Sequence, residues 1–423
     1  MMRPLYSLVL IGAQPLLRRK LRRRGVAEPG YLEHVEERFG RYEGATEPGR
    51  LWIHAVSLGE TRAAAILIEA LRRARPGLRI LLTHGTATGR AEGQRLLREG
   101  DAQAWLPWDT PAAVRRFLEH FRPSVGVLME TEVWPNLAAA CLGRAIPLVL
   151  ANARLSEKSL AQARRLARLS RPAYGALRGA WAQTEGDARR LAQAGATVHG
   201  VFGNLKFDAD PDAALLALGR DWRSTSPRPV VMFASSREGE EGEFLQAIAA
   251  HPQVQWLLVP RHPQRFDEVA ALAVQAGFTV SRRSAWDEAP APAQVWIGDS
   301  LGEMALYYAL ADAALLGGSF APLGGQNLIE AAACGCPVVM GPHTFNFSEA
   351  AELALQAGAA QRVGAMAEGV RAAVELVRDP AARAAAVRAS EGFAAAHRGA
   401  AEKTARGVLQ LIDAQAPSAS AAC

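Results

Sequence analysis

The chain has little cysteine, and its few cysteines are not spaced as metal ligands. They are Cys141, Cys334, Cys336 and Cys423 in a chain of 423 residues. Cys334 and Cys336 flank a glycine in an apolar stretch of small residues, which is typical of packing. Disulfide bonds are therefore not expected, and the composition fits a reducing cytosol. No paired-carboxylate motif indicates a magnesium site, so we expect neither a metal ion nor a cofactor.

The N-terminal apolar run, residues 4–13, is too short to span a bilayer even when it is extended to Leu17, since spanning takes roughly 20 residues. Six cations follow it within residues 18–24. A cleaved signal peptide would carry its cations before the apolar core, and no small-residue cleavage site is evident. We therefore expect residues 1–25 to dip into an anionic membrane surface from the cytoplasm. The alternative is an ordinary first helix with a solvated basic end.

The basic residues lack interleaved aromatic side chains and a known nucleic-acid-binding module, so no nucleic-acid partner is expected. The net charge is a modest +6, with 49% hydrophobic and 21% charged residues, as in globular proteins. A chain of this length is too long for one ordinary core, which favours two domains of roughly 200 residues each. No repeat of fixed period is visible.

Short apolar strands alternate with helical stretches, a pattern that predicts open, mostly parallel α/β sheets. The first expected strands are residues 51–56, 80–83, 124–129 and 147–151, with helices at 62–74 and 160–169 among them. The second series is 229–234, 255–259, 295–297, 313–316 and 337–340. We predict two doubly wound, Rossmann-like domains, 26–208 and 209–423, with a linker near residues 208–226. Ligands bind beyond the carboxyl ends of such strands, so we expect the two sheets to face each other across an active-site cleft.

A glycine-rich stretch after the expected strand 313–316 gives the first indication of a ligand. Gly317-Gly318 follows the strand, and Gly324-Gly325 precedes a helix that carries Asn327 and Glu330 one turn apart. Glycines let the backbone approach a ligand, and the N–H groups of a helix start attract phosphate. An amide and a carboxylate on one helical face suit a nucleotide whose ribose hydroxyls bind the glutamate. The pattern predicts a sugar-nucleotide enzyme.

Polar residues follow the other expected strands as well. In the first half these are Glu60, Glu130, Glu132, Asn152 and Arg154, with Lys206 near the joint between the domains. The alternative for Glu60 is a helix-start carboxylate that serves only the dipole, worth under about 1 kcal/mol, and for Lys206 a plain surface lysine. In the second half, Arg261, His262 and Arg265 follow one strand and suit a phosphate. Residues 298–304 follow the next.

Eight segments of the chain, in order, resemble the Kdo transferase family. They are HAVSLGE (54–60), ETEVWPN (130–136), NARLSEKS (152–159), GNLKFD (203–208), PRHPQRF (260–266), GDSLGEM (298–304), GGSF…GGQNLIEAAA (317–333) and GPHTFNF (341–347). This family comprises the 3-deoxy-D-manno-octulosonic acid (Kdo) transferases of lipopolysaccharide synthesis, inverting glycosyltransferases of the GT-B fold. The resemblance covers nearly the whole chain, including the apolar N-terminus with its basic flank. It implies that the last helices, from about residue 395, pack back onto the first domain.

The resemblance implies that CMP-Kdo donates Kdo to the 6′-hydroxyl of the lipid A precursor, lipid IVA, at the cytoplasmic face of the cell inner membrane. Glu60 resembles the general base, and Glu130 and Lys206 resemble groups that support the transition state. The residues that resemble the family's CMP contacts are Arg261, His262, Gly302, Glu303, Met304, Asn327, Leu328, Ile329 and Glu330. The family often has Asn-Pro-Leu-Glu at 327–330. Proline in a first helical turn only preorganises the helix, so we expect the helix start to survive its absence.

Two rival functions share this architecture. A nucleotide-sugar epimerase has the same two facing domains, but a soluble isomerase has no use for a basic membrane segment. A non-catalytic lipid- or nucleotide-binding protein would be expected to lack a candidate base, and Glu60 is present. Burial beside other carboxylates such as Glu130 would raise the pKa of Glu60 to a useful value.

Overall fold

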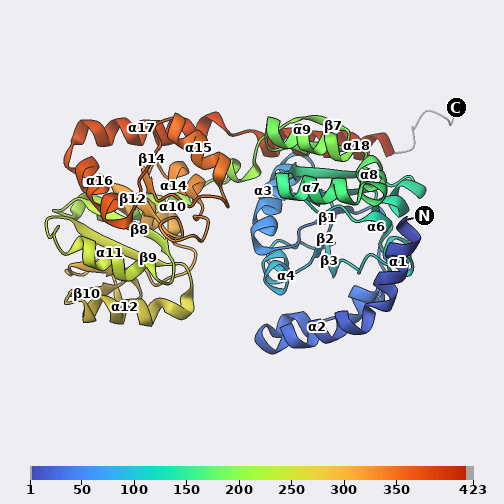
Figure 1. Cartoon of the computed structure of the whole chain (residues 1–423), viewed down its shortest axis with the longest axis horizontal. Coiled ribbons are helices and arrows are strands. Elements are labelled where there is room, and N and C mark those ends of the chain that lie inside the picture. The colour runs from blue at the N-terminus through green and yellow to red at the C-terminus, as the bar shows by residue number, and fades with distance from the viewer. Residues whose placement is uncertain (1, 416–423) are drawn as a thin grey trace. The chain divides into compact units, whose positions relative to one another are not determined.

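The computed structural model describes residues 2–415 and divides into two compact α/β units (Figure 1). The first unit is built from the chain up to Asp208 and again from Arg398 onward, and the second from Ala209–His397. Within the described residues each unit holds one seven-stranded sheet, in which the paired strands are parallel. Both are open α/β sheets, as the alternating pattern predicted.

The sheet of the first unit has the strand order β3-β2-β1-β4-β5-β6-β7. Its strands are β1 (Leu51–His54), β2 (Ile80–His84), β3 (Ala102–Trp105), β4 (Val125–Met129), β5 (Leu148–Ala153), β6 (Gly179–Ala182) and β7 (Val198–Val201). Strands β1, β4 and β5 are buried along their whole length, as expected of parallel strands covered on both faces. The order reverses direction between β1 and β4. Ligands bind at such a switch point, beyond the carboxyl ends of the strands.

Helices cover both faces of this sheet. They are α1 (Met2–Gly12), α2 (Gln14–Ala27), α3 (Leu58–Ala74), α4 (Ala87–Gln94), α5 (Pro111–Phe121), α6 (Pro135–Gly143), α7 (Glu157–Arg165), α8 (Ala167–Gly175), α9 (Glu185–Ala194) and α18 (Ala400–Gln415), with the short 3₁₀ turns η1 (Pro29–Leu32), η2 (Val35–Phe39) and η3 (Leu205–Asp208). The last helix, α18, packs against α3 with Ala405 and Val408 in the core. Asp208 accepts a hydrogen bond from Ala401 N at 2.6 Å and so fixes the start of α18.

The second sheet has the order β10-β11-β9-β8-β12-β13-β14. Its strands are β8 (Val230–Ser236), β9 (Gln255–Pro260), β10 (Val280–Arg282), β11 (Val295–Ile297), β12 (Ala313–Leu316), β13 (Val338–Met340) and β14 (Ala360–Arg362). The surrounding helices are α10 (Ala213–Thr225), α11 (Glu240–Ile248), α12 (Phe266–Gln275), α13 (Met304–Leu310), α14 (Leu328–Ala333), α15 (Ser348–Gln356), α16 (Met366–Arg378) and α17 (Pro380–Ala396), with the turns η4 (Pro263–Arg265) and η5 (Arg283–Ala285). The switch point here lies between β8 and β12.

Every strand that the sequence predicted is present, with ends that differ by no more than two residues. Five strands were not predicted: β3, β6, β7, β10 and β14. Four of these are short and only partly buried, and β6 is a four-residue stretch rich in small residues, so none carries a long apolar run. They lie at or near the edges of the sheets, where burial demands less hydrophobicity.

Two predictions about helices were wrong. The helix expected at 160–169 is broken at Leu166, whose ψ of 31° is not helical, so α7 and α8 are separate. The linker expected near 208–226 is mostly helix α10, which packs on α13. Gly219 allows that contact, because a Cβ there would lie 2.4 Å from the carbonyl oxygen of Leu306. Only residues 209–212 separate η3 from α10.

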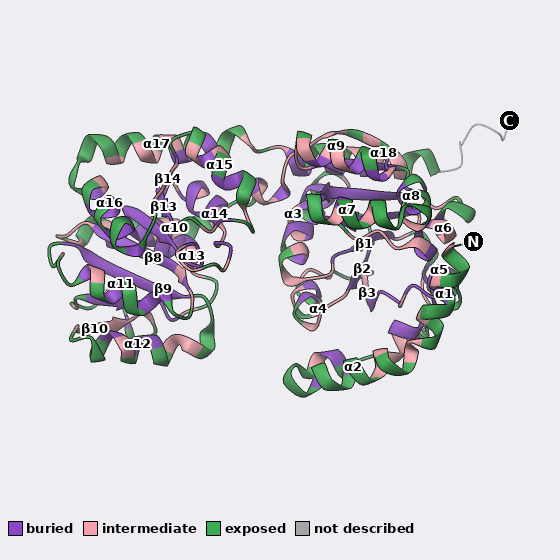
Figure 2. Ribbon diagram, in the orientation of Figure 1, coloured by how far each residue is buried: buried purple, intermediate pink, exposed green. Residues whose placement is uncertain are grey.

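The N-terminal segment folds as helices α1 and α2, and α1 contacts α6 and α8 of the first unit. Ser7 is buried and hydrogen-bonds to Asn136. Leu21 packs with Tyr31 and Phe39. The rest of both helices is largely exposed (Figure 2). Among residues 2–415, no helix combines the length and the apolar character that crossing a membrane requires.

Candidate active site

Glu60 lies in the first turn of α3, directly after β1, and closes a capping box. The Ser57 side chain accepts a hydrogen bond from Glu60 N at 3.4 Å. In return, the Glu60 carboxylate accepts hydrogen bonds from Val56 N at 2.9 Å and from Ser57 Oγ at 3.1 Å. The first of these bonds satisfies an N–H group that the helix start leaves unpaired, and the bond from Val56 N fixes the residue just before the N-cap. Glu60 therefore has a local structural role, and its carboxylate is held in one orientation.

The surroundings of Glu60 raise the pKa of its carboxyl group to near neutral pH. The pKa of Glu60 is raised to about 7, mainly by burial and also by the nearby Glu130 and Glu132, against the hydrogen bonds from Val56 and Ser57 that lower it. A carboxylate with that pKa is a much better proton acceptor than an exposed one, and it is still ionised in a useful fraction of molecules at pH 7.

Glu130 follows β4 in a conformation that few side chains adopt. Its φ is +58°, and Asn152 at the end of β5 has a φ of +50°. Residues held in this region cost about 1–3 kcal/mol each and cluster at functional sites. Glu130 is only 6% exposed, and its carboxylate pairs with Arg154 Nε at 2.8 Å. The pair keeps the Glu130 charge buried beside Glu60.

Asn152 connects this edge to the turn that carries Lys206. Its side-chain oxygen accepts a hydrogen bond from Leu205 N at 3.0 Å, at the start of η3. The η3 turn also packs against α3, the helix of Glu60. The first unit thus brings Glu60, Glu130 and Lys206 to the carboxyl-end edge of its sheet.

In the second unit, one buried carboxylate organises the glycine-rich loop. Glu240 is 2% exposed and accepts hydrogen bonds from the backbone N–H of Gly318 (2.8 Å), Phe320 (3.1 Å) and Ala321 (3.2 Å). Burial raises the pKa of Glu240, against these bonds. Gly317 is required by close packing, because a Cβ would lie 2.2 Å from the carbonyl oxygen of Ser235. These glycines therefore shape the loop, and three of its N–H groups are already occupied.

Helix α14 begins at Leu328 without a proline, so the helix start survives the departure from the family pattern. Leu328 and Ile329 are each 1% exposed, which leaves mainly their main chain to contact a ligand. Asn327 stands at the N-cap, and its Oδ1 is buried with no hydrogen-bond partner among residues 2–415. A buried acceptor without a partner is unusual in a protein, so a donor from a bound ligand would suit Asn327 Oδ1.

The remaining donor-site candidates lie on loops after β9 and β11. Arg261 Nε donates to Gln326 Oε1 at 3.2 Å, which joins its loop to the start of α14. Burial, with Arg237 and neighbouring arginines, lowers the pKa of His262, so this ring is neutral at pH 7. After β11, Glu303 pairs with Arg283 at 2.8 Å.

Gly302 has a φ of +85° and precedes Glu303, while Met304 opens α13. These two residues therefore lie at the same turn as the Glu303 ion pair. Within the described part of the chain, no group of three or more His, Cys, Asp or Glu side chains is arranged to hold a metal ion.

From the sequence, Arg154 was noted only as a polar residue after a strand, with no role, and Glu240 was not selected. Arg154 lies in the segment NARLSEKS, residues 152–159, but nothing in the sequence shows that it pairs with Glu130. Glu240 is one of four glutamates in residues 238–243, and only the fold shows which side chain turns toward the glycine loop. Gly239, directly before α11, was the only feature of the sequence that could have indicated a helix start at Glu240.

The family model for "3-deoxy-D-manno-octulosonic-acid transferase (kdotransferase)" matches residues 33–209. The 3-deoxy-D-manno-octulosonic acid transferase of Bordetella pertussis is 49% identical over 95% of this chain and 97% of that protein. The protein of the same name from Haemophilus influenzae is 34% identical over 89% of this chain and 90% of its own length.

Among solved structures, Anabaena HepE in complex with UDP gives a TM-score of 0.56 at 16% identity, over 85% of this chain and 99% of that chain. UDP-GlcNAc 2-epimerase from Neisseria meningitidis gives 0.55 at 14% identity, over 86% of this chain and all of that chain. At such identities the likeness shows the fold alone, which is the GT-B fold. The curated relatives carry the assignment further: the chain belongs to the 3-deoxy-D-manno-octulosonic acid transferase family.

Proposed function

We propose that this protein transfers Kdo from CMP-Kdo to the 6′-hydroxyl of the lipid A precursor lipid IVA, with inversion and with Glu60 as the general base. The names of the relatives support Kdo transfer. The observation that carries the assignment of the base is the pKa of Glu60, raised to about 7 in a first turn that fixes its carboxylate. The helix-start bonds of Glu60 would serve any protein of this fold, so family membership is what favours the transferase over a non-catalytic protein or an epimerase.

The proposed reaction is a single displacement at the anomeric carbon. The acceptor hydroxyl oxygen forms a bond to that carbon while Glu60 takes the hydroxyl proton. The bond from the anomeric carbon to the phosphate oxygen breaks, and CMP leaves with the electron pair. Attack opposite to the leaving group inverts the configuration. Lys206 and the Glu130–Arg154 pair would balance the charges that change near the reacting atoms.

The donor would bind on the second unit. We assign its phosphate and ribose to the start of α14, where Asn327 lacks a partner for Oδ1 and Glu330 offers a carboxylate. Arg261 would neutralise an anion beside this helix start, and neutral His262 would donate or accept a hydrogen bond. Gly302, Glu303 and Met304 would complete the CMP contacts after β11.

The pH dependence of the rate tests the role of Glu60. A general base must be ionised, so kcat/KM should rise with pH through about 7 and level off above it, following the pKa of the free enzyme. The measurement is initial CMP release from CMP-Kdo with lipid IVA in detergent, from pH 5 to 9. A flat profile down to about pH 5 would show that a carboxyl with its ordinary pKa, or no carboxyl at all, sets the rate.

We also propose that helices α1 and α2 bind the cytoplasmic face of the inner membrane. Leu5, Leu8 and Val9 share one face of α1 and are 56%, 66% and 62% exposed. Helix α2 adds a row of exposed cations, Arg19, Lys20, Arg22, Arg23 and Arg24. An exposed apolar face followed by cations is typical of a helix that lies in the interface of an anionic bilayer.

Replacing two exposed side chains should weaken that binding without unfolding the protein. Leu8→Ser/Val9→Ser should lose most co-sedimentation with vesicles of phosphatidylglycerol and phosphatidylethanolamine, because the buried apolar area is lost. Val274→Ser, an equally exposed change on α12, serves as the control and should bind as the wild type does. Equal binding by all three proteins would contradict the membrane assignment.

A further inference from the structure

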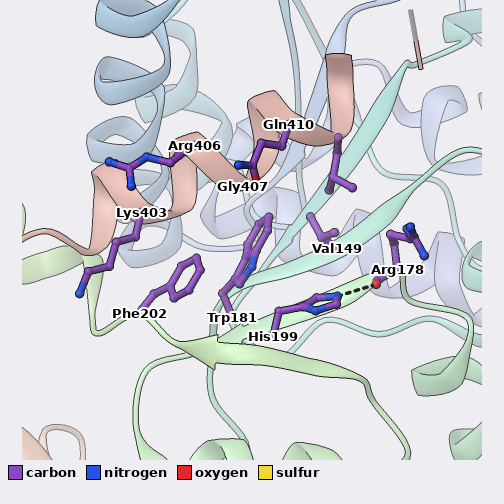
Figure 3. Close-up of a pocket in the computed structure, with 10 residues that line it drawn as sticks. Val149, Arg178, Trp181, His199, Phe202, Lys403, Arg406, Gly407 and Gln410 are labelled. Carbon is purple, nitrogen blue, oxygen red and sulfur yellow. Dashed lines mark hydrogen bonds between the residues drawn. The ribbon is translucent and has the colours of Figure 1, made fainter. Parts of the chain in front are cut away.

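A cavity of about 540 Å³ lies in the first unit between helix α18 and strands β5–β7 (Figure 3). It is lined by Val149, Arg178, Trp181, His199, Phe202, Lys403, Arg406, Gly407, Gln410 and Leu411. Its volume is in the usual range for small-molecule sites. None of the residues assigned above to catalysis or to the donor lines it. The cavity is therefore a feature that the proposed reaction leaves unused.

The cavity forms where α18 leaves the edge of the sheet. Strand β7 is the edge strand, and Trp181 of β6 stacks on Phe202, which follows β7, with ring centroids 5.6 Å apart and planes 13° from parallel. Helix α18 lies directly on the Trp181 ring through Gly407, where a Cβ would be 2.5 Å from the indole. The aromatic rings make a rigid floor, and the helix makes one wall.

The polar groups around this floor are all basic or neutral. Lys403 and Arg406 lie at one end of the cavity, Arg178 lies at the other, and the rings of Phe202, Trp181 and His199 lie between them (Figure 3). No acidic residue lines the cavity, and none of the three cations forms an ion pair within residues 2–415. The carboxylate of Asp413 on the same helix is engaged elsewhere, with Arg75 at 2.6 Å.

His199 adds a fixed polar group. Its Nε2 bonds to the carbonyl oxygen of Arg178 at 3.0 Å, so this nitrogen carries the proton. In the neutral ring, Nδ1 is then left as an acceptor for a ligand hydroxyl.

We propose that this cavity binds a phosphate monoester carried on a sugar ring. Lys403 and Arg406 would hold the phosphate, since unpaired cations on one helix face suit an anion. The ring would pack on Phe202 and His199, with its hydroxyls toward Nδ1 of His199 and the Gln410 side chain. A bare inorganic anion would leave the aromatic floor uncovered, and an uncharged apolar ligand would leave the cations unpaired. The ligand would be a free sugar phosphate or a nucleotide.

Charge reversal on α18 tests the site. Lys403→Glu/Arg406→Glu changes two exposed side chains, and Arg168→Glu/Arg189→Glu on α8 and α9 is the matched control with the same change in net charge. Glucose 1-phosphate, titrated calorimetrically, should bind the wild type and the control alike and the α18 variant at least about tenfold more weakly. Inorganic phosphate should bind more weakly than glucose 1-phosphate. Equal affinity for the two variants, or no saturable binding to the wild type, would overturn the proposal.

CMP separates the two sources of ligand and keeps this test independent of the proposed donor site. If the cavity takes nucleotides, CMP should bind the wild type at one more site than it binds the α18 variant. A cavity specific for sugar phosphates would instead give the same CMP stoichiometry in both proteins, alongside the loss of glucose 1-phosphate binding. If the donor site proposed on the second unit is wrong, the wild type and the α18 variant should each bind one CMP fewer. Equal binding of CMP and of glucose 1-phosphate by both would contradict the cavity site alone.

Discussion

Glu60→Gln should lower kcat by about 10²–10⁴-fold while leaving the affinity for CMP nearly unchanged. The amide cannot accept the hydroxyl proton, but its oxygen can still accept the bond from Val56 N, and its NH₂ can donate to Ser57 Oγ. The capping box of α3 should therefore survive, and the loss should be chemical. Single-turnover measurements of CMP release, with calorimetric titration of CMP, separate the two effects.

One control variant, Ser57→Ala, tests whether that loss comes from the missing base. Ser57→Ala removes the other half of the capping box, and it should cost about 1 kcal/mol of stability while keeping the base. If Ser57→Ala lowers kcat as much as Glu60→Gln does, Glu60 acts through the helix start and is not the base. Transfer by Glu60→Gln at the wild-type rate would show that Glu60 is not the base.

Glu240→Ala should have the largest effect in the second unit, lowering the free energy of unfolding by about 3 kcal/mol and weakening CMP binding. The change leaves the N–H groups of Gly318, Phe320 and Ala321 without their acceptor, and each unsatisfied buried donor costs about 1–3 kcal/mol before relaxation. Glu240→Gln keeps one of the two acceptor oxygens, so its free energy of unfolding should fall by about half as much. Urea unfolding followed by circular dichroism measures the stability.

The matched control is Glu243→Ala, on the exposed side of the same first turn of α11. It removes a charge from the helix start without touching the glycine loop, so its effect should stay within about 1 kcal/mol. An effect of Glu240→Ala no larger than that of the control would show that the loop holds its shape without the carboxylate.

The interior of the fold could be predicted from the sequence because buried parallel strands need continuous apolar runs. Strands β1, β4, β8 and β12 were found within two residues of their expected ends. Edge strands such as β7 and β14 carry no such run, because one side of the strand has no neighbour. Helix α10 was taken for a linker because the Ser/Pro-rich residues 224–229 follow it. Its packing on α13 depends on Gly219, a contact that no local pattern reveals.

For the candidate site, the sequence indicated which residues follow each strand but not what each one contacts. Glu60, Glu130 and Lys206 were selected by position and resemblance, and the structure brings them to one sheet edge. The partner of Glu130 is Arg154, which directly follows the neighbouring strand β5, and the acceptor for the glycine loop is Glu240. Such pairings depend on strand order and on backbone angles such as the φ of +58° at Glu130. The cavity beside α18 is lined by residues more than 200 positions apart in the sequence, so no local motif could predict it.

The mass of the lipid product shows whether this protein transfers Kdo to lipid IVA. Purified protein would be incubated with freshly made CMP-Kdo and lipid IVA, with Glu60→Gln in parallel, and the lipid analysed by mass spectrometry. We expect a gain of one or more Kdo units with matching release of CMP in the wild type, and no gain in the variant. Unchanged lipid in the wild type, despite saturable CMP binding, would contradict the proposed reaction and leave only the fold and the family.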